Sequence, residues 1–176
     1  TNDRRQRQMC IRDRDSFSGF SLGVFPLYPS SRGTTHLRSN NFRDNPIIKA
    51  NYLSTPEDRN LTIKGLRLIR KIATQKSITP YIVREVRPGR NVEDDQGLLN
   101  FARETGQTSW HSVSTCRMGK GPNDVVDYNL KVFGIENLRV VDSSIMPCMP
   151  SSNTNAPSIV IGEKGADIIL KNAKTK

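Results

Sequence analysis

Three short segments in the C-terminal part of the chain carry side chains that could do acid–base chemistry or bind a ligand. They hold a histidine, an aspartate followed by a serine, and a polar turn: His111; Asp142 and Ser143; Asn153, Thr154, Asn155 and Pro157. An imidazole with an ordinary pKa is largely neutral at pH 7 and can take a proton from a hydroxyl group. Taken alone, His111 could equally be a structural histidine, so its role depends on what surrounds it.

The second segment reads as a strand that ends in polar residues. Its apolar run, Leu138 to Val141, predicts a short buried strand with Asp142 and Ser143 directly after it. The carboxyl ends of strands are where open α/β sheets present groups to a ligand. The alternative is that Asp142 only caps the turn that follows the strand.

The third segment opens the last predicted helix, which runs from Pro157 to Ala173. Asn155 or Ala156 is the expected N-cap, with Pro157 at the first helical position. The N–H groups at such a helix start would suit an anionic group. Polar helix starts are common, so this feature alone does not establish a binding site.

The first half of the chain supplies the elements on which these segments must rest. Three antiparallel strands are predicted, at residues 20–28, 34–38 and 46–53. A helix follows from the N-cap Thr55 to about Gln75, with Pro56 in its first turn. A second helix is predicted from Glu93 to Glu104, ended by Gly106.

The net charge of +10 suggests nucleic acid at first sight, but its distribution does not support that partner. Residues 1–14 contribute +3 of it, and the other basic residues are scattered without interleaved aromatics that could stack on bases. Three cysteines and two histidines offer no metal-ligand spacing, and no apolar run is long enough to span a membrane. We therefore expect no nucleic acid, no metal and no membrane span. Cys116 and Cys148 are predicted to be buried thiols and His36 an exposed side chain.

Residues 1–14 have no periodicity that predicts an element. Residues 9–14 match the translation of a transposase adapter used to prepare sequencing libraries (ATG TGT ATA AGA GAC AG). We interpret residues 1–14 as a non-native segment, with a disordered basic tail as the alternative.

Together, the three C-terminal segments, in this order and at these separations, resemble the C-terminal portion of the glucose–methanol–choline (GMC) oxidoreductase family, with the insect glucose-dehydrogenase-like branch as the nearest match. The resemblance runs from about Phe20 to Leu170 and is densest from Trp110 to Asp167. The turn at Pro29–Gly33 and the stretch Ala50–Leu53 resemble the substrate domain of that family.

The resemblance implies a mixed α+β and α/β fragment. Residues 15–108 would form part of the substrate-binding domain, an antiparallel sheet with helices. Residues 109–176 would be the catalytic segment that adds a C-terminal strand and helix to an FAD-binding, Rossmann-like domain.

The resemblance also implies FAD as cofactor and an alcohol or sugar as substrate. His111 would be the catalytic base near flavin N5, and Asn153 the second member of the catalytic pair. The remaining candidates would bind the cofactor: Asp142 and Ser143 near its ribityl and phosphate groups, and Thr154, Asn155 and Pro157 near the isoalloxazine ring.

The family's Gly-x-Gly-x-x-Gly turn does not occur in this sequence; the nearest run, Gly162 to Gly165, lies inside a predicted helix. We therefore expect an N-terminal FAD-binding domain as the missing partner of this chain. The competing hypothesis is a non-catalytic or truncated relative that serves as a binding scaffold. An extracellular parent protein is one option, under which the Asn60 sequon would be a glycosylation site.

Overall fold

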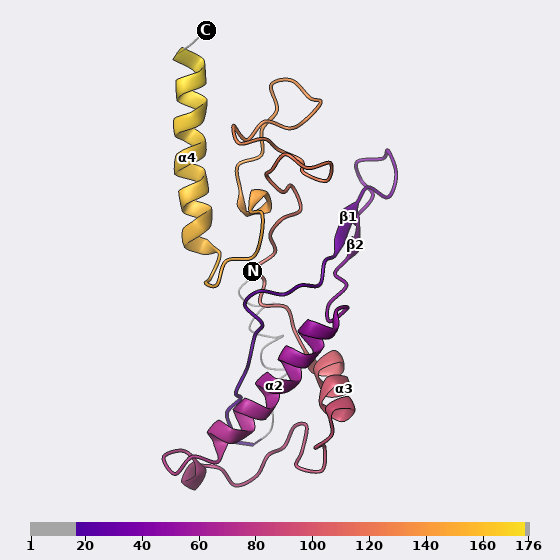
Figure 1. Cartoon of the computed structure of the whole chain (residues 1–176), viewed down its shortest axis with the longest axis vertical. Helices are drawn as coiled ribbons and strands as arrows, with labels where there is room; N and C mark the ends of the chain where they lie inside the picture. The colour runs from indigo at the N-terminus through magenta and orange to yellow at the C-terminus, as the bar shows by residue number, and fades with distance from the viewer. Residues whose placement is uncertain (1–16, 175–176) are drawn as a thin grey trace.

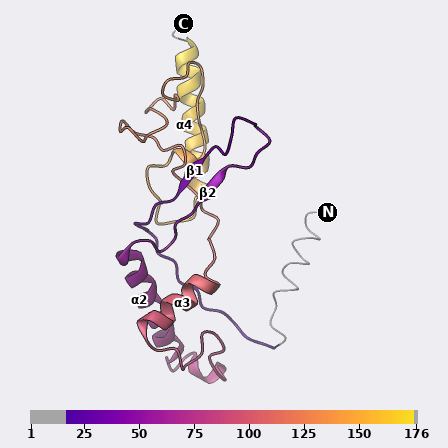
Figure 2. The same cartoon turned by 90° about the vertical axis from the view of Figure 1, so that its right-hand side faces the viewer.

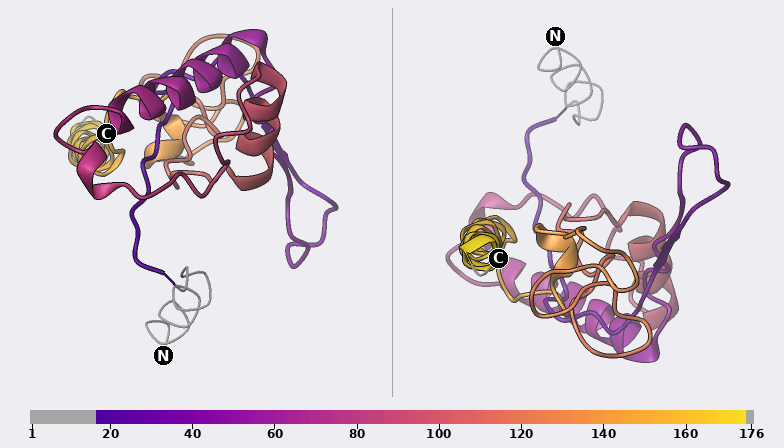
Figure 3. Two further views of the ribbon diagram at one scale, coloured as in Figure 1. Left: turned by 90° about the horizontal axis from the view of Figure 1, so that it is seen from below. Right: turned by 90° about the horizontal axis from the view of Figure 1, so that it is seen from above.

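A computed structural model describes residues 17–174 of the chain as an α+β arrangement, and the prediction for residues 1–14 lies outside that range. In chain order the elements are β1 (Thr34–His36), β2 (Ile47–Lys49), α2 (Pro56–Ala73), the 3-10 helix η1 (Thr79–Tyr81), α3 (Asp95–Thr105), the 3-10 helix η2 (Ser143–Ile145) and α4 (Asn155–Lys174). Figures 1 and 2 show α2 and α3 toward one end of an elongated arrangement, and α4 with the loops before it toward the other. The view along the long axis in Figure 3 shows the β1–β2 hairpin projecting on the side away from α4.

The predicted sheet has two of its three strands. β1 and β2 pair antiparallel, with Thr35 opposite Ile48. The segment 20–28, predicted as a strand, is irregular, and that prediction was wrong. A strand needs a neighbour to bond with, and the described residues provide none for this segment. β2 ends at Lys49, earlier than predicted, because Asn51 and Leu53 have φ values of 55° and 53° in the left-handed region.

The first of the two helices begins where its capping residue predicts. Thr55 caps α2 by accepting a hydrogen bond from the Asp58 N–H, at 3.3 Å. α3 begins at Asp95, two residues after the predicted Glu93, because Asp94 caps it by accepting from the Gly97 N–H at 2.8 Å. Gly106 ends α3 as predicted, its N–H bonding to the Ala102 carbonyl.

A buried carboxylate ties the N-terminal segment to the start of α2. Asp58 is only 4% exposed, and its oxygens accept hydrogen bonds from the N–H of Ser30 (2.8 Å), the hydroxyl of Ser30 (3.0 Å) and the N–H of Ser31 (2.8 Å). The Ser31 hydroxyl in turn accepts from the N–H groups of Ser54 and Thr55. Burial raises the pKa of the Asp58 carboxyl, but the hydrogen bonds from Ser31 and Ser30 outweigh it and lower that pKa from 3.8 to about 2.

The second half has a small core of its own. Val126, Leu130 and Ile145 are its buried centre, and Ile161 and Ile168 of α4 pack against them. The predicted strand from Leu138 to Val141 is absent and that prediction was wrong. The segment makes only isolated contacts with the turn before it: an antiparallel bridge between residues 131 and 139, and bonds from the Val132 N–H to the Leu138 carbonyl and from the Val140 N–H to the Leu130 carbonyl.

Much apolar surface stays uncovered. Six hydrophobic residues are buried among those described, whereas Ile159 and Leu170 of α4 are 59% and 61% exposed. An amphipathic helix normally buries one stripe, so apolar residues on a second face indicate that α4 packs on two sides in the intact protein. Within residues 17–174, the structure has no helix with the length and apolar character needed to cross a membrane.

Candidate active site

His111 is held by the start of α4. Its Nδ1 lies 2.8 Å from the Thr154 Oγ1, and the ring is half-buried. The residue before it, Trp110, has a φ of 58°, so the chain turns sharply as it reaches the histidine. The histidine thus sits at the end of the segment that leaves α3, facing the helix that ends the described chain.

Thr154 is the N-cap of α4. Its carbonyl accepts the first helical bond, from the Ser158 N–H at 3.0 Å, and also the Ser158 hydroxyl at 2.6 Å. The prediction of Asn155 or Ala156 as N-cap was therefore wrong. Pro157 occupies the third helical position instead of the first, which is possible because N–H groups throughout the first turn need no helical partner.

The chain after His111 is bonded to η2. The Cys116 N–H donates to the Ser144 carbonyl at 3.0 Å, and the Ser114 hydroxyl donates to the Met146 carbonyl at 2.7 Å. Ser114 itself has a φ of 70°, a conformation that its hydroxyl bond helps to hold. Hydrogen bonds therefore join residues 111–118, η2 and the start of α4 into one unit.

Asp142 caps η2. Its Oδ1 accepts hydrogen bonds from the N–H and the hydroxyl of Ser144, and the residue is exposed. The turn-capping interpretation thus describes its contacts, and no strand precedes it. Ser143 is half-buried and its hydroxyl reaches the Ser112 carbonyl at 3.5 Å. The cofactor contacts expected of Asp142 and Ser143 stay a prediction.

Of the remaining candidates, the structure brings Thr154 to His111 and leaves Asn153 and Asn155 exposed on either side of it. The resemblance implies a place near the flavin for Thr154 but no contact between Thr154 and His111. No local signal could have identified this contact, because 43 residues separate the two.

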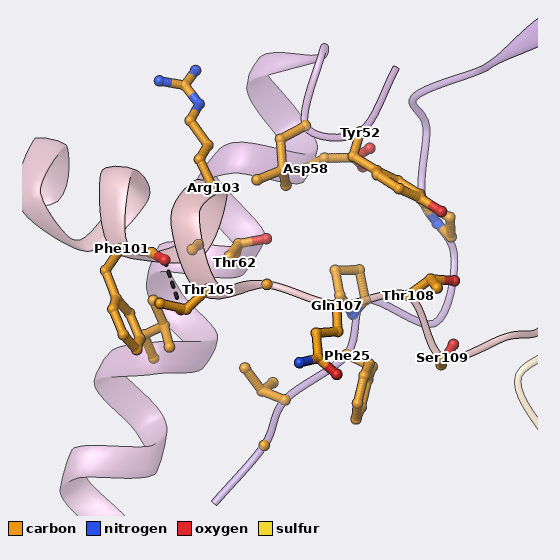
Figure 4. Close-up of a pocket in the computed structure, with 18 of the residues that line it drawn as sticks. Phe25, Tyr52, Asp58, Thr62, Phe101, Arg103, Thr105, Gln107, Thr108 and Ser109 are labelled. Atoms are coloured by element: carbon orange, nitrogen blue, oxygen red, sulfur yellow. Dashed lines mark hydrogen bonds between the residues drawn. The ribbon is translucent and has the colours of Figure 1, made fainter. Parts of the chain in front are cut away.

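An open hollow lies in front of the histidine. His111 and Trp110 line it together with parts of α2, α3 and the N-terminal segment. Figure 4 shows one part of it, where Tyr52 and Phe25 surround the opening with Gln107 and Thr108 of the segment that leads to His111.

The loop that supports this segment is fixed by a carboxylate. Asp124 accepts hydrogen bonds from the Gly121 N–H (2.6 Å) and the Arg117 Nε, and these two donors lower the pKa of its carboxyl. A Cβ atom at Gly119 would lie 2.1 Å from the Asp124 Oδ2, so a side chain there would displace this carboxylate.

The side chains of the cysteines and of the second histidine make no contact with His111 that the structure records within residues 17–174. Cys116 is half-buried, but Cys148 is exposed, so the prediction of a buried thiol was wrong for Cys148. It follows η2 on an irregular segment and is exposed among residues 17–174. His36 is exposed, as predicted.

Comparison with known proteins decides the family. The family model described as GMC oxidoreductase matches residues 29–162. The chain belongs to the GMC oxidoreductase family. It is 44% identical over 153 residues to an alcohol dehydrogenase [acceptor] of Pseudomonas putida, covering 87% of this chain and 28% of that protein. It is 43% identical over 152 residues to the mitochondrial choline dehydrogenase of Mus musculus, covering 85% of this chain and 26% of that protein.

Solved GMC oxidoreductase structures show the same arrangement. An FAD-dependent oxidoreductase from Chaetomium thermophilum aligns with a TM-score of 0.77 at 31% identity, over 84% of this chain and 26% of that one. A fungal aryl-alcohol oxidase aligns with a TM-score of 0.72 at 30% identity, over 84% and 25%. The chain thus spans about a quarter of the length of its relatives, and FAD is the cofactor of the family.

The residues present fit one end of that cofactor. The exposed side chains of Asp142, Asn153 and Asn155 and the first turn of the 20-residue helix α4 offer hydrogen-bonding groups around His111. Such groups could bind a polar or anionic part of FAD, since a helix N-terminus stabilises negative charge. The chain contains no glycine-rich turn for the pyrophosphate, which another part of the protein would have to bind.

Proposed function

We propose that the protein containing this chain is an FAD-dependent oxidoreductase that oxidises the CH–OH group of an alcohol or sugar, with His111 as the base. The observation that carries the proposal is the 2.8 Å contact between the His111 Nδ1 and the Thr154 Oγ1, at the edge of an open hollow. Membership of the GMC oxidoreductase family supports it.

The contact with Thr154 orients the imidazole ring and is compatible with the tautomer in which Nδ1 carries the proton. With its Nδ1–H donating to the Thr154 hydroxyl, His111 keeps an unprotonated Nε2 that can take the substrate's hydroxyl proton. The Thr154 backbone is fixed in turn by Ser158 of α4. The helix therefore orients the base, and the imidazole ring loses less rotational freedom when the substrate binds.

The other candidates take supporting roles in this proposal. Asn153 donates a hydrogen bond to the substrate oxygen as its proton leaves, because an amide cannot itself relay a proton. Asp142 and Ser143 bind the ribityl and phosphate portion of FAD, and Thr154, Asn155 and Pro157 lie beside its ring system. When bound, FAD supplies the acceptor for the hydride that leaves the substrate carbon.

The remaining part of the protein completes the site. An N-terminal FAD-binding domain supplies the pyrophosphate site and covers the exposed face of α4. The division at residue 108, the insect glucose-dehydrogenase-like specificity and an extracellular location stay predictions. The relatives compared above carry the names of alcohol and choline dehydrogenases.

Spectroscopy on the full-length protein tests the proposal. We expect the purified protein to show the absorption bands of oxidised flavin. Under anaerobic conditions these bands should decrease when one of the following substrates is added: ethanol, benzyl alcohol, choline or glucose. His111→Asn should retain the flavin but lose the bleaching, whereas the control Tyr128→Phe, at an exposed residue that does not line the hollow, should behave as the native protein. A full-length protein without flavin would favour the binding-scaffold hypothesis.

A further inference from the structure

Tyr52 is presented by an unusual stretch of backbone. Both its neighbours, Asn51 and Leu53, have positive φ values of 55° and 53°. Residues with side chains rarely adopt this conformation, and Leu does so less readily than Asn. Such conformations persist where the surroundings hold them, and they concentrate at functional sites.

The backbone on both sides of Tyr52 is pinned by side chains. The Asn51 amide donates to the Arg32 carbonyl at 2.9 Å. The Arg59 guanidinium donates to the carbonyls of Leu53 (3.0 Å) and Ser54 (2.6 Å). The bend is therefore fixed from both ends, whereas the Tyr52 side chain is 70% exposed and its hydroxyl has no hydrogen-bond partner within residues 17–174.

The Tyr52 ring lies on the hollow in front of His111. Tyr52, Trp110 and His111 all line it. Figure 4 shows Tyr52 at the same opening as Thr108 and Ser109, shortly before His111 in the chain. Trp110 is 77% exposed and has a positive φ, so two large exposed aromatic side chains on constrained backbone line the hollow that His111 also lines.

We propose that Tyr52 is a substrate-binding residue whose ring packs against the uncharged, aromatic or apolar body of the alcohol. The inference rests on the proposed function and names its substrate class. Aromatic rings would also attract a cationic alcohol. However, basic residues outnumber acidic ones around the hollow, and the Asp58 carboxylate there is already bonded to Ser30 and Ser31. The charge of the lining therefore favours a neutral alcohol over a cationic one.

Binding of benzyl alcohol to the full-length flavoprotein tests this inference. Calorimetry is done in a His111→Asn background, in which binding is measured without turnover. We expect adding Tyr52→Ala to raise the Kd for benzyl alcohol about tenfold, because an aromatic contact and its buried area are lost. Tyr52→Phe, which keeps the ring, should change that Kd less than about twofold. Tyr128→Ala is the matched control, since Tyr128 is exposed in the other half and does not line the hollow.

Three results would overturn the inference. They are a His111→Asn protein with Tyr52 intact that does not bind benzyl alcohol, a Kd for benzyl alcohol that Tyr52→Ala leaves unchanged, or tighter binding of choline than of benzyl alcohol. Loss of flavin or a lowered Tm in Tyr52→Ala would assign Tyr52 to packing against the rest of the protein, and would also overturn it. Failure of the proposed function can be told apart from failure of this inference. In that case the flavin absorption of the native protein, with His111 and Tyr52 intact, does not decrease with any of the alcohols.

Discussion

The Nδ1 atom of His111 lies 2.8 Å from the Oγ1 atom of Thr154, although 43 residues separate them in the chain. The histidine lies on the segment that follows α3, and the threonine is the N-cap of α4. A helix start thereby fixes the ring of the proposed base, and the geometry depends on the packing of α4 as much as on the histidine itself.

Removal of the threonine hydroxyl should impair the chemical step. In Thr154→Val we expect kcat of the full-length protein to fall about five- to tenfold, the effect of losing one hydrogen bond of about 1 kcal/mol. KM should change less than about twofold, since the substrate contacts remain. Thr154→Ser should recover most of the rate, because it restores the hydroxyl next to the His111 Nδ1. Steady-state kinetics check this; equal losses in Thr154→Val and Thr154→Ser would contradict it.

Asp58 should make the protein sensitive to acid. Its folded-state pKa of about 2 lies below the usual 3.8, so its contribution to stability is present above about pH 4 and is lost as the pH falls toward 2. That shift corresponds to about 2 kcal/mol. Urea unfolding of Asp58→Asn should show this loss at pH 7 and a smaller difference from the native protein near pH 2.5. The exposed neighbour Glu57→Gln is the control; a constant difference at both pH values would argue against the hydrogen-bonded carboxylate.

Gly165 should not tolerate a side chain. A Cβ atom there would lie 2.3 Å from the Val141 Cγ1, so Gly165→Ala has to displace a packed valine at a cost of about 1–3 kcal/mol. Gly162→Ala on the same helix meets no atom within 4 Å among the described residues and should keep or raise Tm. Thermal unfolding distinguishes the two variants. Equal Tm values would mean that α4 does not pack on Val141 as described.

Two arginines of α2 should differ in importance. Arg70 binds Glu85 and the carbonyls of Val92 and Gly89, with both partners of the ion pair about three-quarters buried. The Arg67–Asp95 pair is 50% and 71% exposed. We expect Arg70→Lys to cost about 1–2 kcal/mol, because an ammonium cannot reproduce the fork of donors. Arg67→Lys should cost less than about 0.5 kcal/mol. Chemical denaturation of the two variants measures both losses of stability. A larger loss in Arg67→Lys than in Arg70→Lys would contradict the prediction.

The sequence predicted the elements whose signals are local. Thr55 and Pro56 predicted the start of α2, and Gly106 predicted the end of α3, because caps act within one turn. The strand predicted at residues 20–28 did not form. Its apolar residues carry no information about a pairing partner, and the described chain does not supply one.

The candidate site was predictable in its residue types but not in its contacts. The resemblance pointed to His111 and to the turn at Asn153–Asn155 together. Which of these touches the histidine depends on where α4 begins, and Thr154 as N-cap moves that start earlier than Pro157 suggested. Asp142 was expected at a strand end; its bonds to Ser144 follow from local turn chemistry that competes with strand formation.

The bond between His111 and Thr154 also bears on how such enzymes can diversify. Both residues, and the whole of the core around Val126, lie after α3. A crossover between homologous genes in the stretch encoding residues 106–109 would transfer the base together with its positioning residue. The same event would exchange Tyr52 and the rest of the first half for those of another lineage. Substrate preference could therefore be inherited separately from the proton-transfer machinery.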